Sequence, residues 1–392
     1  MTNLRILILA LACTLAGLTG GIWLGGHPER LPDGVRDALV DDFLATRAEI
    51  IDKVSADFFE EVDEESLREA SLKGIVESLD DRFSAYFTPK EAETIAQSLS
   101  GAFDGVGMTV DEDKRGLVVV SVFDGSPADR SGLRPEDIIT AVNGRSIAGV
   151  PSDVATAKIK GPSGTKVRLT VLKKKGAKKR TLTIVRERIE VPITDGRLET
   201  VNGVKLGVAQ LATFSSGAHG QLRDEIDGLL KKGAKGIVLD LRNNGGGLLQ
   251  EGVLVASIFV PEGETVVSTD GRSRPKRVLD ATGDPIDADI PVSVLVNRGT
   301  ASASEIVAGA LRDQKRATIV GTRTFGKGVF QELESLANGG ALDITVGRYF
   351  LPSGENISDK GIQPTVRAKD DPDTREDEGA ETALRALSAK VK

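Results

Sequence analysis

Two serines in the segment VNRGTASASEIVAGAL, residues 296–311, are candidate nucleophiles: Ser302 and Ser304. The segment starts at the end of an apolar run that is typical of a buried strand, and a helical apolar stripe begins at Ile306. Ser302 is therefore expected at a strand-to-helix junction, where the positive end of the helix dipole stabilises an oxyanion. A helix N-cap also favours serine here, so the segment alone leaves both roles open.

The base for such a serine is less obvious, because the chain has only 2 histidines. His27 lies beside an apolar N-terminal stretch, and His219 begins an amphipathic segment in which a surface position is expected. A serine nucleophile can use a lysine instead, provided that burial keeps the amine neutral. Lys327 in VGTRTFGKGVFQ, residues 320–331, lies between two glycines and near two phenylalanines, although an ordinary loop lysine also fits this stretch.

A third segment, GIVLDLRNNGGGLL at residues 236–249, predicts a buried strand, a glycine loop and the start of a helix. Such a loop presents unobstructed backbone amides, which suit an anion near a helix start. A phosphate-binding loop would end in lysine followed by serine or threonine, and a dinucleotide-binding loop has a different glycine spacing. These departures argue against nucleotide binding.

The elements that position these segments follow from changes in pattern along the chain. Residues 28–100 are rich in charge and have helical spacing, whereas residues 101–190 consist of short strands and glycine turns. Residues 191–368 alternate apolar strands with helices, which predicts a parallel sheet with helices on its faces. Residues 369–392 form an acidic tail that we expect to be mobile or loosely docked. The expected fold class is multidomain α/β.

The first 27 residues predict an export signal. One positive charge, Arg5, precedes an uncharged stretch, and residues 6–26 approach the roughly 20 apolar residues that span a bilayer. This stretch is expected to stay as a single-pass anchor or to be cleaved, with the body on the extracytoplasmic side, in the periplasm or secreted. Cys13, the single cysteine, lies within it, so no disulfide is expected in the folded part.

The overall composition excludes some classes of function. Hydrophobic residues make up 40% of the chain and charged residues 28%, as in ordinary globular proteins. The net charge of −7 argues against nucleic acid as a partner. The dense basic run KKKGAKKR, residues 173–180, is interpreted as a solvated hairpin. Two histidines and one cysteine leave few ligands for a metal, so neither a metal nor another cofactor is expected.

The segments around Ser302 and Lys327 together resemble the active-site block of the carboxyl-terminal processing proteases, the S41 serine peptidases. The resemblance runs through NRGTASASEIVAGALRDQKRATIVGTRTFGKGVFQ and implies that Ser302, not Ser304, is the nucleophile. It implies that Lys327, 25 residues later, is the base and that Gln331 supports this lysine. The implied core is a crotonase/ClpP-like α/β fold, and the position of Ser304 inside the helix agrees with the choice of Ser302.

The resemblance also gives the glycine loop a role. It implies that the amides of Gly246 and Ala303 stabilise the oxyanion. This chain has Gly245 where the family has a proline, so the donor glycine stays open within residues 245–247.

Residues 101–190 resemble a PDZ domain of the bacterial type. The match rests on the segment SPADRSGLRPEDIITAVNG and on a carboxylate-binding loop formed by Gly105, Val106, Gly107 and Met108. Glycine amides in such a loop can hold a terminal carboxylate while an extended peptide pairs with the next strand. The resemblance implies recognition of apolar carboxyl-terminal ends and gating of the site. Lys160 lies where some gated relatives carry an arginine that couples the module to the protease core.

The sequence therefore predicts a serine endopeptidase or tail-trimming peptidase of envelope or exported proteins. Its expected partners are protein or peptide substrates with apolar carboxyl termini, the membrane through the N-terminal segment, and a homo-oligomer or an adaptor. Two alternatives are weighed against it. One is a binding protein that has lost the chemistry, and the other is a crotonase-type enzyme acting on acyl thioesters, which would need acidic catalytic residues and no PDZ segment.

Overall fold

The computed structural model describes residues 17, 42–173, 179–370, 374 and 376–391. The predicted membrane segment, residues 6–26, lies outside the described residues, apart from residue 17. Within the described part of the chain, no helix combines the length and the apolar character needed to cross a bilayer.

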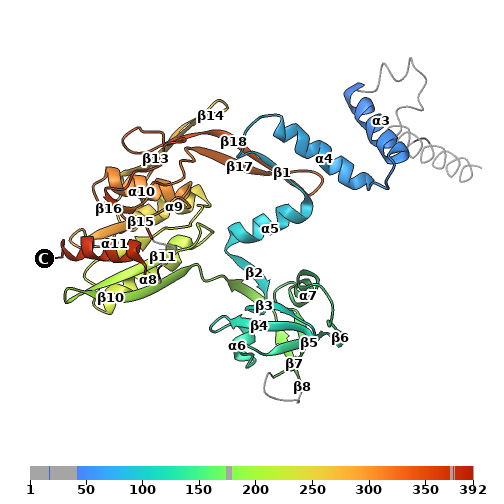
Figure 1. Cartoon of the computed structure of the whole chain (residues 1–392), viewed down its shortest axis with the longest axis horizontal. Helices are drawn as coiled ribbons and strands as arrows, with labels where there is room; N and C mark the ends of the chain where they lie inside the picture. Colours follow the sequence, from blue (N-terminus) through green and yellow to red (C-terminus); the bar gives the residue numbers. More distant parts are fainter. Residues whose placement is uncertain (1–16, 18–41, 174–178, 371–373, 375, 392) are drawn as a thin grey trace, which may run out of the picture. The chain divides into compact units, whose positions relative to one another are not determined.

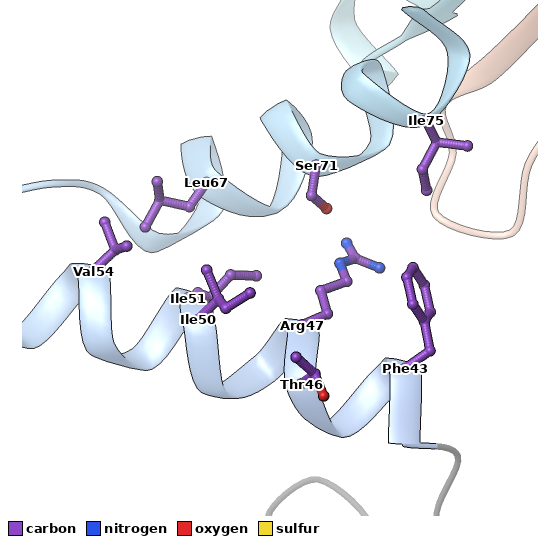
Figure 2. Close-up of a pocket in the computed structure, with 9 residues that line it drawn as sticks. All are labelled: Phe43, Thr46, Arg47, Ile50, Ile51, Val54, Leu67, Ser71 and Ile75. Carbon is purple, nitrogen blue, oxygen red and sulfur yellow. The ribbon is translucent and has the colours of Figure 1, made fainter. Parts of the chain in front are cut away.

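The described residues up to Thr88 and residues 334–343 form one compact unit. Its helices are α3 (Asp42–Asp57) and α4 (Glu64–Glu77), and Asp63 caps α4 by accepting a hydrogen bond from the amide of Ser66 at 2.9 Å. Apolar side chains of the two helices face each other, as Figure 2 shows, around a cavity of about 310 Å³. The helical prediction for this region is confirmed.

The same unit contains a short strand that the sequence analysis missed. Strand β1 (Ala85–Phe87) pairs antiparallel with the first residues of β18 (Ala341–Phe350), with Tyr86 opposite Leu342. Three residues are too few to show an alternating pattern, so this strand depends on a partner more than 250 residues away in the chain.

The second unit begins with α5 (Pro89–Ser100), which leads into a module of short strands. These elements are β2 (Ala102–Gly105), β3 (Met108–Asp113), β4 (Gly116–Val122), α6 (Pro127–Arg130), β5 (Ile138–Val142), β6 (Arg145–Ser146), α7 (Ser152–Ile159), β7 (Lys166–Leu172), β8 (Lys179–Val185) and β9 (Glu187–Glu190). The sheet order β3-β4-β5-β7-β8 leaves β3 at an edge, so its outer backbone groups can pair with an added strand.

Local sequence signals set the turns of this module. Ser126 caps α6 by accepting a hydrogen bond from the amide of Asp129, and Pro127 occupies the first helical position. Asn143 has φ 50° and Gly144 has φ 81°, the left-handed pair of a tight turn between β5 and β6.

The remaining residues build an α/β core around one sheet (Figure 1). Its strands, in sheet order, are β10 (Thr194–Val201), β11 (Val204–Leu211), β12 (Ile237–Asp240), β15 (Val292–Val296), β16 (Ala317–Gly321) and β19 (Val366–Arg367). All neighbours from β11 to β19 pair parallel, and β10 adds an antiparallel edge. The predicted strand–helix alternation with parallel pairing is confirmed.

Helices cover both faces of this sheet. Helices α8 (Ala218–Lys231), α9 (Leu249–Ser257) and α10 (Ala303–Asp313) pack on one face, over side chains such as Ala209 and Leu211. The intervening side chains, Leu206 and Val208, point to the other face. This alternation follows from the two-residue period of a strand and explains why the strands are apolar throughout.

The opposite face is covered by the C-terminal helix α11 (Glu378–Ser388), which Figure 1 shows in red. Ala383 and Leu387 are fully buried against the sheet. Two carboxylates, Asp370 and Asp377, bind the guanidinium of Arg242 at 3.1 and 2.7 Å. The expectation of a loosely docked tail is therefore wrong for α11, because its apolar stripe fills a face that would otherwise lie open to water.

A second, smaller sheet follows the order β1-β18-β13-β14, with β17 also paired to β18. Its remaining strands are β13 (Thr265–Gly271), β14 (Arg274–Asp280) and β17 (Val329–Ser335). Strand β17 begins directly after the loop that contains Lys327, so this sheet anchors that loop.

Candidate active site

Ser302 lies where β15 gives way to α10, with the helix beginning at Ala303. Its backbone has φ 57° and ψ −120°, whereas N-cap residues are extended with negative φ. A non-glycine residue held at this conformation is strained, and such strain is typical of functional sites. This backbone distinguishes Ser302 from an ordinary helix cap, and its side chain is partly exposed.

Ser304, the other candidate, is fully buried. Its hydroxyl donates a hydrogen bond to the carbonyl of Asn244 at 2.9 Å, and the same carbonyl accepts the amide of Ala301 at 3.1 Å. Ser304 therefore ties the start of α10 to the glycine loop and is not open to a substrate.

Glu305 is the centre of the hydrogen-bond network, and the sequence analysis did not single it out. Its side chain is fully buried in the first turn of α10. Atom Oε2 accepts the amides of Ser302 at 3.1 Å and Lys327 at 3.0 Å. Atom Oε1 accepts the amide of Gly326 at 2.7 Å and the hydroxyl of Thr324. One carboxylate thus joins the candidate nucleophile to the loop of the candidate base.

Tyr349 of β18 reports on the surroundings of this carboxylate. Its side chain is 1% exposed, and its hydroxyl has no hydrogen-bond partner among the described residues. Burial raises the pKa of Tyr349 well above its usual value, and the negative charge of Glu305 adds to this effect. The Tyr349 side chain is therefore desolvated and close enough to the Glu305 carboxylate to respond to its charge.

The Lys327 loop rests on residues 356–362. The carbonyl of Gly326 accepts the amide of Asp359 at 2.9 Å, and the amide of Phe325 donates to the carbonyl of Thr300 at 3.0 Å. A Cβ atom at Gly328 would lie 2.4 Å from the backbone nitrogen of Ser358, so only glycine fits. Lys327 itself is half-buried.

Gln331 lies on β17, four residues after Lys327. Its amide Nε2 donates to the hydroxyl of Thr345 on the neighbouring strand β18 at 2.9 Å. This bond assigns the amide group to Thr345 and leaves the Oε1 atom of Gln331 as the acceptor for another donor.

The glycine loop approaches Ser302 closely. A Cβ atom at Gly246, which has φ 98°, would lie 2.7 Å from Ser302 Cβ and 2.9 Å from the nitrogen of Ala303. The amide of Ala303 donates no hydrogen bond within the described ranges. The amide of Gly246 donates to Asn244 Oδ1 at 2.9 Å, so an oxyanion role for Gly246 requires it to exchange this bond for one to the substrate.

The candidate peptide-binding loop lies at the start of β3. Gly105, Val106 and Gly107 are buried, and Met108 is half-buried. The carbonyl of Gly107 accepts the amide of Phe123 at 3.1 Å and the hydroxyl of Ser126 at 3.0 Å. These bonds hold the loop against the segment around α6 and next to the edge strand.

Lys160 belongs to the same module as this loop. It follows α7, and its ammonium group donates to Gln97 Oε1 of α5 at 3.2 Å. The same ammonium lies 5.3 Å from the centre of the Phe103 ring on β2, within the range of a cation–π contact. Lys160 thus binds the segment that leads into the module rather than a residue of the α/β core.

His219 is half-exposed, as expected, but it also binds a buried group. Its Nδ1 atom lies 2.8 Å from Glu251 Oε2, and the amides of His219 and Gly217 donate to the same carboxylate at 3.0 and 2.9 Å. Burial alone would raise the pKa of Glu251, but the hydrogen bonds from His219 and Gly217 outweigh it and hold this pKa below its ordinary value. These hydrogen bonds hold the start of helix α9, which follows the glycine loop, against the start of helix α8.

The local signal for Glu305 was present in the sequence. A serine followed three residues later by glutamate is the capping-box pattern, and Ser302 and Glu305 satisfy it. The structural role of Asn244 has no such signal, because its partners Leu211, Ala301 and Ser304 come from two distant segments.

Comparison with known proteins gives two family matches. The model of peptidase family S41 matches residues 205–368, and the PDZ domain model matches residues 94–172. The first match contains all five residues proposed for the chemistry: Gly246, Ser302, Ala303, Lys327 and Gln331.

Similar whole proteins were also found. The carboxy-terminal processing protease CtpA of Bacillus subtilis is 35% identical over 81% of this chain and 67% of its own length. A probable CtpA-like serine protease of Staphylococcus aureus is 37% identical over 80% of this chain and 62% of its own length. The chain thus spans about two thirds of these curated relatives. A solved photosystem II D1 C-terminal processing protease is 31% identical, with 87% and 90% of the two chains covered and a TM-score of 0.47.

Proposed function

Because this chain belongs to peptidase family S41, the carboxyl-terminal processing serine proteases, we propose that it cleaves peptide bonds through Ser302 and Lys327. The predicted fold class, an α/β peptidase core with a PDZ domain and an N-terminal helical segment, is confirmed. The observation that carries the proposal is the shared acceptor Glu305 Oε2, which holds the amides of both residues.

In the proposed reaction, Ser302 Oγ attacks the peptide carbonyl, and its proton passes to the neutral amine of Lys327. The tetrahedral intermediate collapses to an acyl-enzyme as Lys327 gives the proton to the leaving amine. A water molecule then repeats the sequence on the acyl group and releases Ser302. The proposal requires that the amine of the half-buried Lys327 be desolvated when substrate covers it, because desolvation disfavours the charged form.

The remaining proposed roles follow the contacts around this pair. The amide of Ala303 and an amide of the glycine loop, Gly246 in our proposal, stabilise the oxyanion. Gln331 accepts a hydrogen bond from the amine of Lys327 through Oε1, since its Nε2 is committed to Thr345. We propose no metal or other cofactor.

We further propose that the PDZ domain captures the apolar carboxyl-terminal ends of substrates. The buried glycine loop before the edge strand β3 supports this role, because an added peptide strand can pair with that edge. Lys160 is proposed to transmit the position of this domain through Gln97, on the helix α5 that leads into it, and Phe103, on its strand β2. Lysine lacks the planar fork of arginine, so this coupling rests on one charge rather than on paired bonds.

Cleavage of an unfolded test protein is the direct experiment. The wild-type chain is expected to cleave it, and Ser302→Ala is expected to bind it without cleavage. Binding without cleavage by the wild-type chain would favour the non-catalytic binding protein. Turnover of an acyl thioester instead of a peptide would favour the crotonase-type enzyme.

The cellular setting is likewise a proposal. We propose that the protein acts on envelope or exported proteins from the extracytoplasmic side, held by its N-terminal segment or released after cleavage. Fractionation of cells before and after removal of residues 1–27 tests the location. Analytical ultracentrifugation of the mature chain tests the proposed homo-oligomer.

A further inference from the structure

A basic pocket lies at the carboxyl ends of the last two strands of the core sheet. Its volume is about 410 Å³, and its cationic lining side chains are Arg323, Arg367 and Lys369. Strands β16 and β19 run parallel there, with Gly321 opposite Arg367. Carboxyl ends of parallel strands are where ligands of open α/β sheets bind. None of these three residues has a role in the chemistry proposed above.

The three cationic side chains of this pocket are exposed. None of them forms an ion pair with any residue that the structure describes. The chain as a whole has a net charge of −7 and many ion-paired arginines, including Arg242 and Arg312. Three like charges around one cavity repel each other unless an anion lies between them. An anionic ligand would relieve this repulsion.

The pocket is built on the loop of the proposed base. Arg323 is followed by Thr324, whose hydroxyl donates to Glu305 and accepts the amide of Ile362 at 2.7 Å. The pocket wall resumes at Gln363, directly after Ile362. The backbone that lines the pocket thus continues into the network that holds Ser302 and Lys327 on Glu305.

We propose that this basic pocket binds acidic side chains of the peptide substrate and so gives the enzyme a preference for acidic segments beside the scissile bond. The inference rests on the proposed peptidase function and names a substrate class for it. The neutral lining of Thr322, Gln363, Pro364 and Ala368 leaves room for a polypeptide backbone between the cations.

A peptide fits this pocket better than an isolated phosphate or a lipid headgroup. Buried phosphate sites rely on backbone amides at a helix start, and the lining residues belong to strand ends and loops. Cations on β19 and in the loops that follow β16 and β19 can instead meet successive carboxylates of an extended chain, whose side chains are spaced along the backbone.

The first test is binding, which does not depend on catalysis. Ser302→Ala protein is titrated with a fluorescent glutamate-rich peptide and with its glutamine-matched counterpart, in 50 mM and 500 mM salt. Tighter binding of the glutamate peptide is expected, by about tenfold at low salt and much less at high salt. Adding Arg323→Gln and Arg367→Gln is expected to abolish the difference, whereas the control Lys231→Gln, which changes an exposed lysine at the end of helix α8, keeps it.

The second test is selectivity in catalysis. On a neutral peptide the double variant Arg323→Gln/Arg367→Gln should match the wild type, which shows that the active site is intact. On the glutamate-containing substrate its kcat/KM should fall about tenfold, with most of the change in KM. Equal binding of the glutamate and glutamine peptides would overturn the inference. Inorganic phosphate or anionic vesicles that occupy the pocket and displace the glutamate peptide would also overturn it. If the protein does not cleave peptides at all, the binding test with Ser302→Ala still decides whether the pocket prefers acidic peptides.

Discussion

The backbone amides of Ser302 and Lys327 donate to one and the same atom, Glu305 Oε2, at 3.1 and 3.0 Å. These residues are 25 positions apart in the chain, Ser302 just before α10 and Lys327 in the loop before β17. Because Glu305 is fully buried and bound from four sides, neither segment can shift without breaking a bond to a desolvated carboxylate. The relative backbone position of the proposed nucleophile and the proposed base is thus set by a residue to which we assign no part in the proton transfer.

Replacing Glu305 with glutamine tests this positioning role. Glutamine offers one acceptor oxygen, and its amide group would face donors instead of accepting from them. We expect kcat to fall by about 100-fold with KM nearly unchanged, since binding surfaces are untouched. Peptide cleavage kinetics and thermal unfolding measure the two effects. A variant with normal kcat but a lower melting temperature would assign Glu305 a purely structural role.

Replacing Lys327 with arginine tests the base. Arginine keeps the length and charge of the side chain but cannot become neutral in a protein. We expect Lys327→Arg and Lys327→Ala to lose cleavage while circular dichroism stays that of the wild type. Lys360→Arg, a neighbouring exposed lysine in the segment that supports the loop, serves as control and should remain active. Substantial activity in Lys327→Arg would remove Lys327 as the base.

Replacing each serine separately distinguishes the nucleophile from the structural hydroxyl. Ser302→Ala should abolish cleavage and labelling by a serine-directed fluorophosphonate. Ser304→Ala loses the bond to the Asn244 carbonyl, for which we expect about 1 kcal/mol lower stability and residual cleavage and labelling. Labelling that survives in Ser302→Ala but not in Ser304→Ala would reverse the assignment.

The ion pair of the C-terminal helix predicts a pH dependence of stability. The hydrogen bond from Arg242 holds the pKa of Asp377 below its ordinary value. A carboxyl with a depressed folded pKa stabilises the fold above its unfolded pKa, about 3.9, and this contribution is lost as pH falls through the folded pKa. We therefore expect Asp377→Asn to lower the urea midpoint at pH 7, with a loss in the free energy of unfolding of less than ~1 kcal/mol because the pair is partly exposed.

The difference between Asp377→Asn and the wild type should close as the pH is lowered below about 4. Asp284→Asn removes an exposed carboxylate for which the structure shows no ion pair among the described residues, and it should shift the midpoint little at either pH. If the difference in urea midpoint between Asp377→Asn and the wild type widens on acidification, the lowered pKa assigned to Asp377 is contradicted.

Local patterns in the sequence were sufficient for much of the fold. The alternation of apolar strands with helices predicted the parallel sheet, because continuous apolar runs are stable only between two covered faces. The junction before residue 303 placed Ser302 at a helix start, and the three glycines at 245–247 predicted the loop beside it. Each of these signals lies within a dozen residues, which is the range over which hydrophobic period and turn chemistry act.

Contacts between distant segments determined those parts of the fold and of the candidate site that local patterns do not predict. Helix α11 covers the open face of the sheet, Asn244 binds both Leu211 and the start of α10, and Glu305 joins two loops. The basic pocket brings together Arg323, just after β16, and Arg367, on β19, because these two strands pair in the folded sheet. A carboxylate or a guanidinium has the same local pattern whichever partner it finds, so sequence alone determined which residues can react, and only tertiary packing determined which of them are held together.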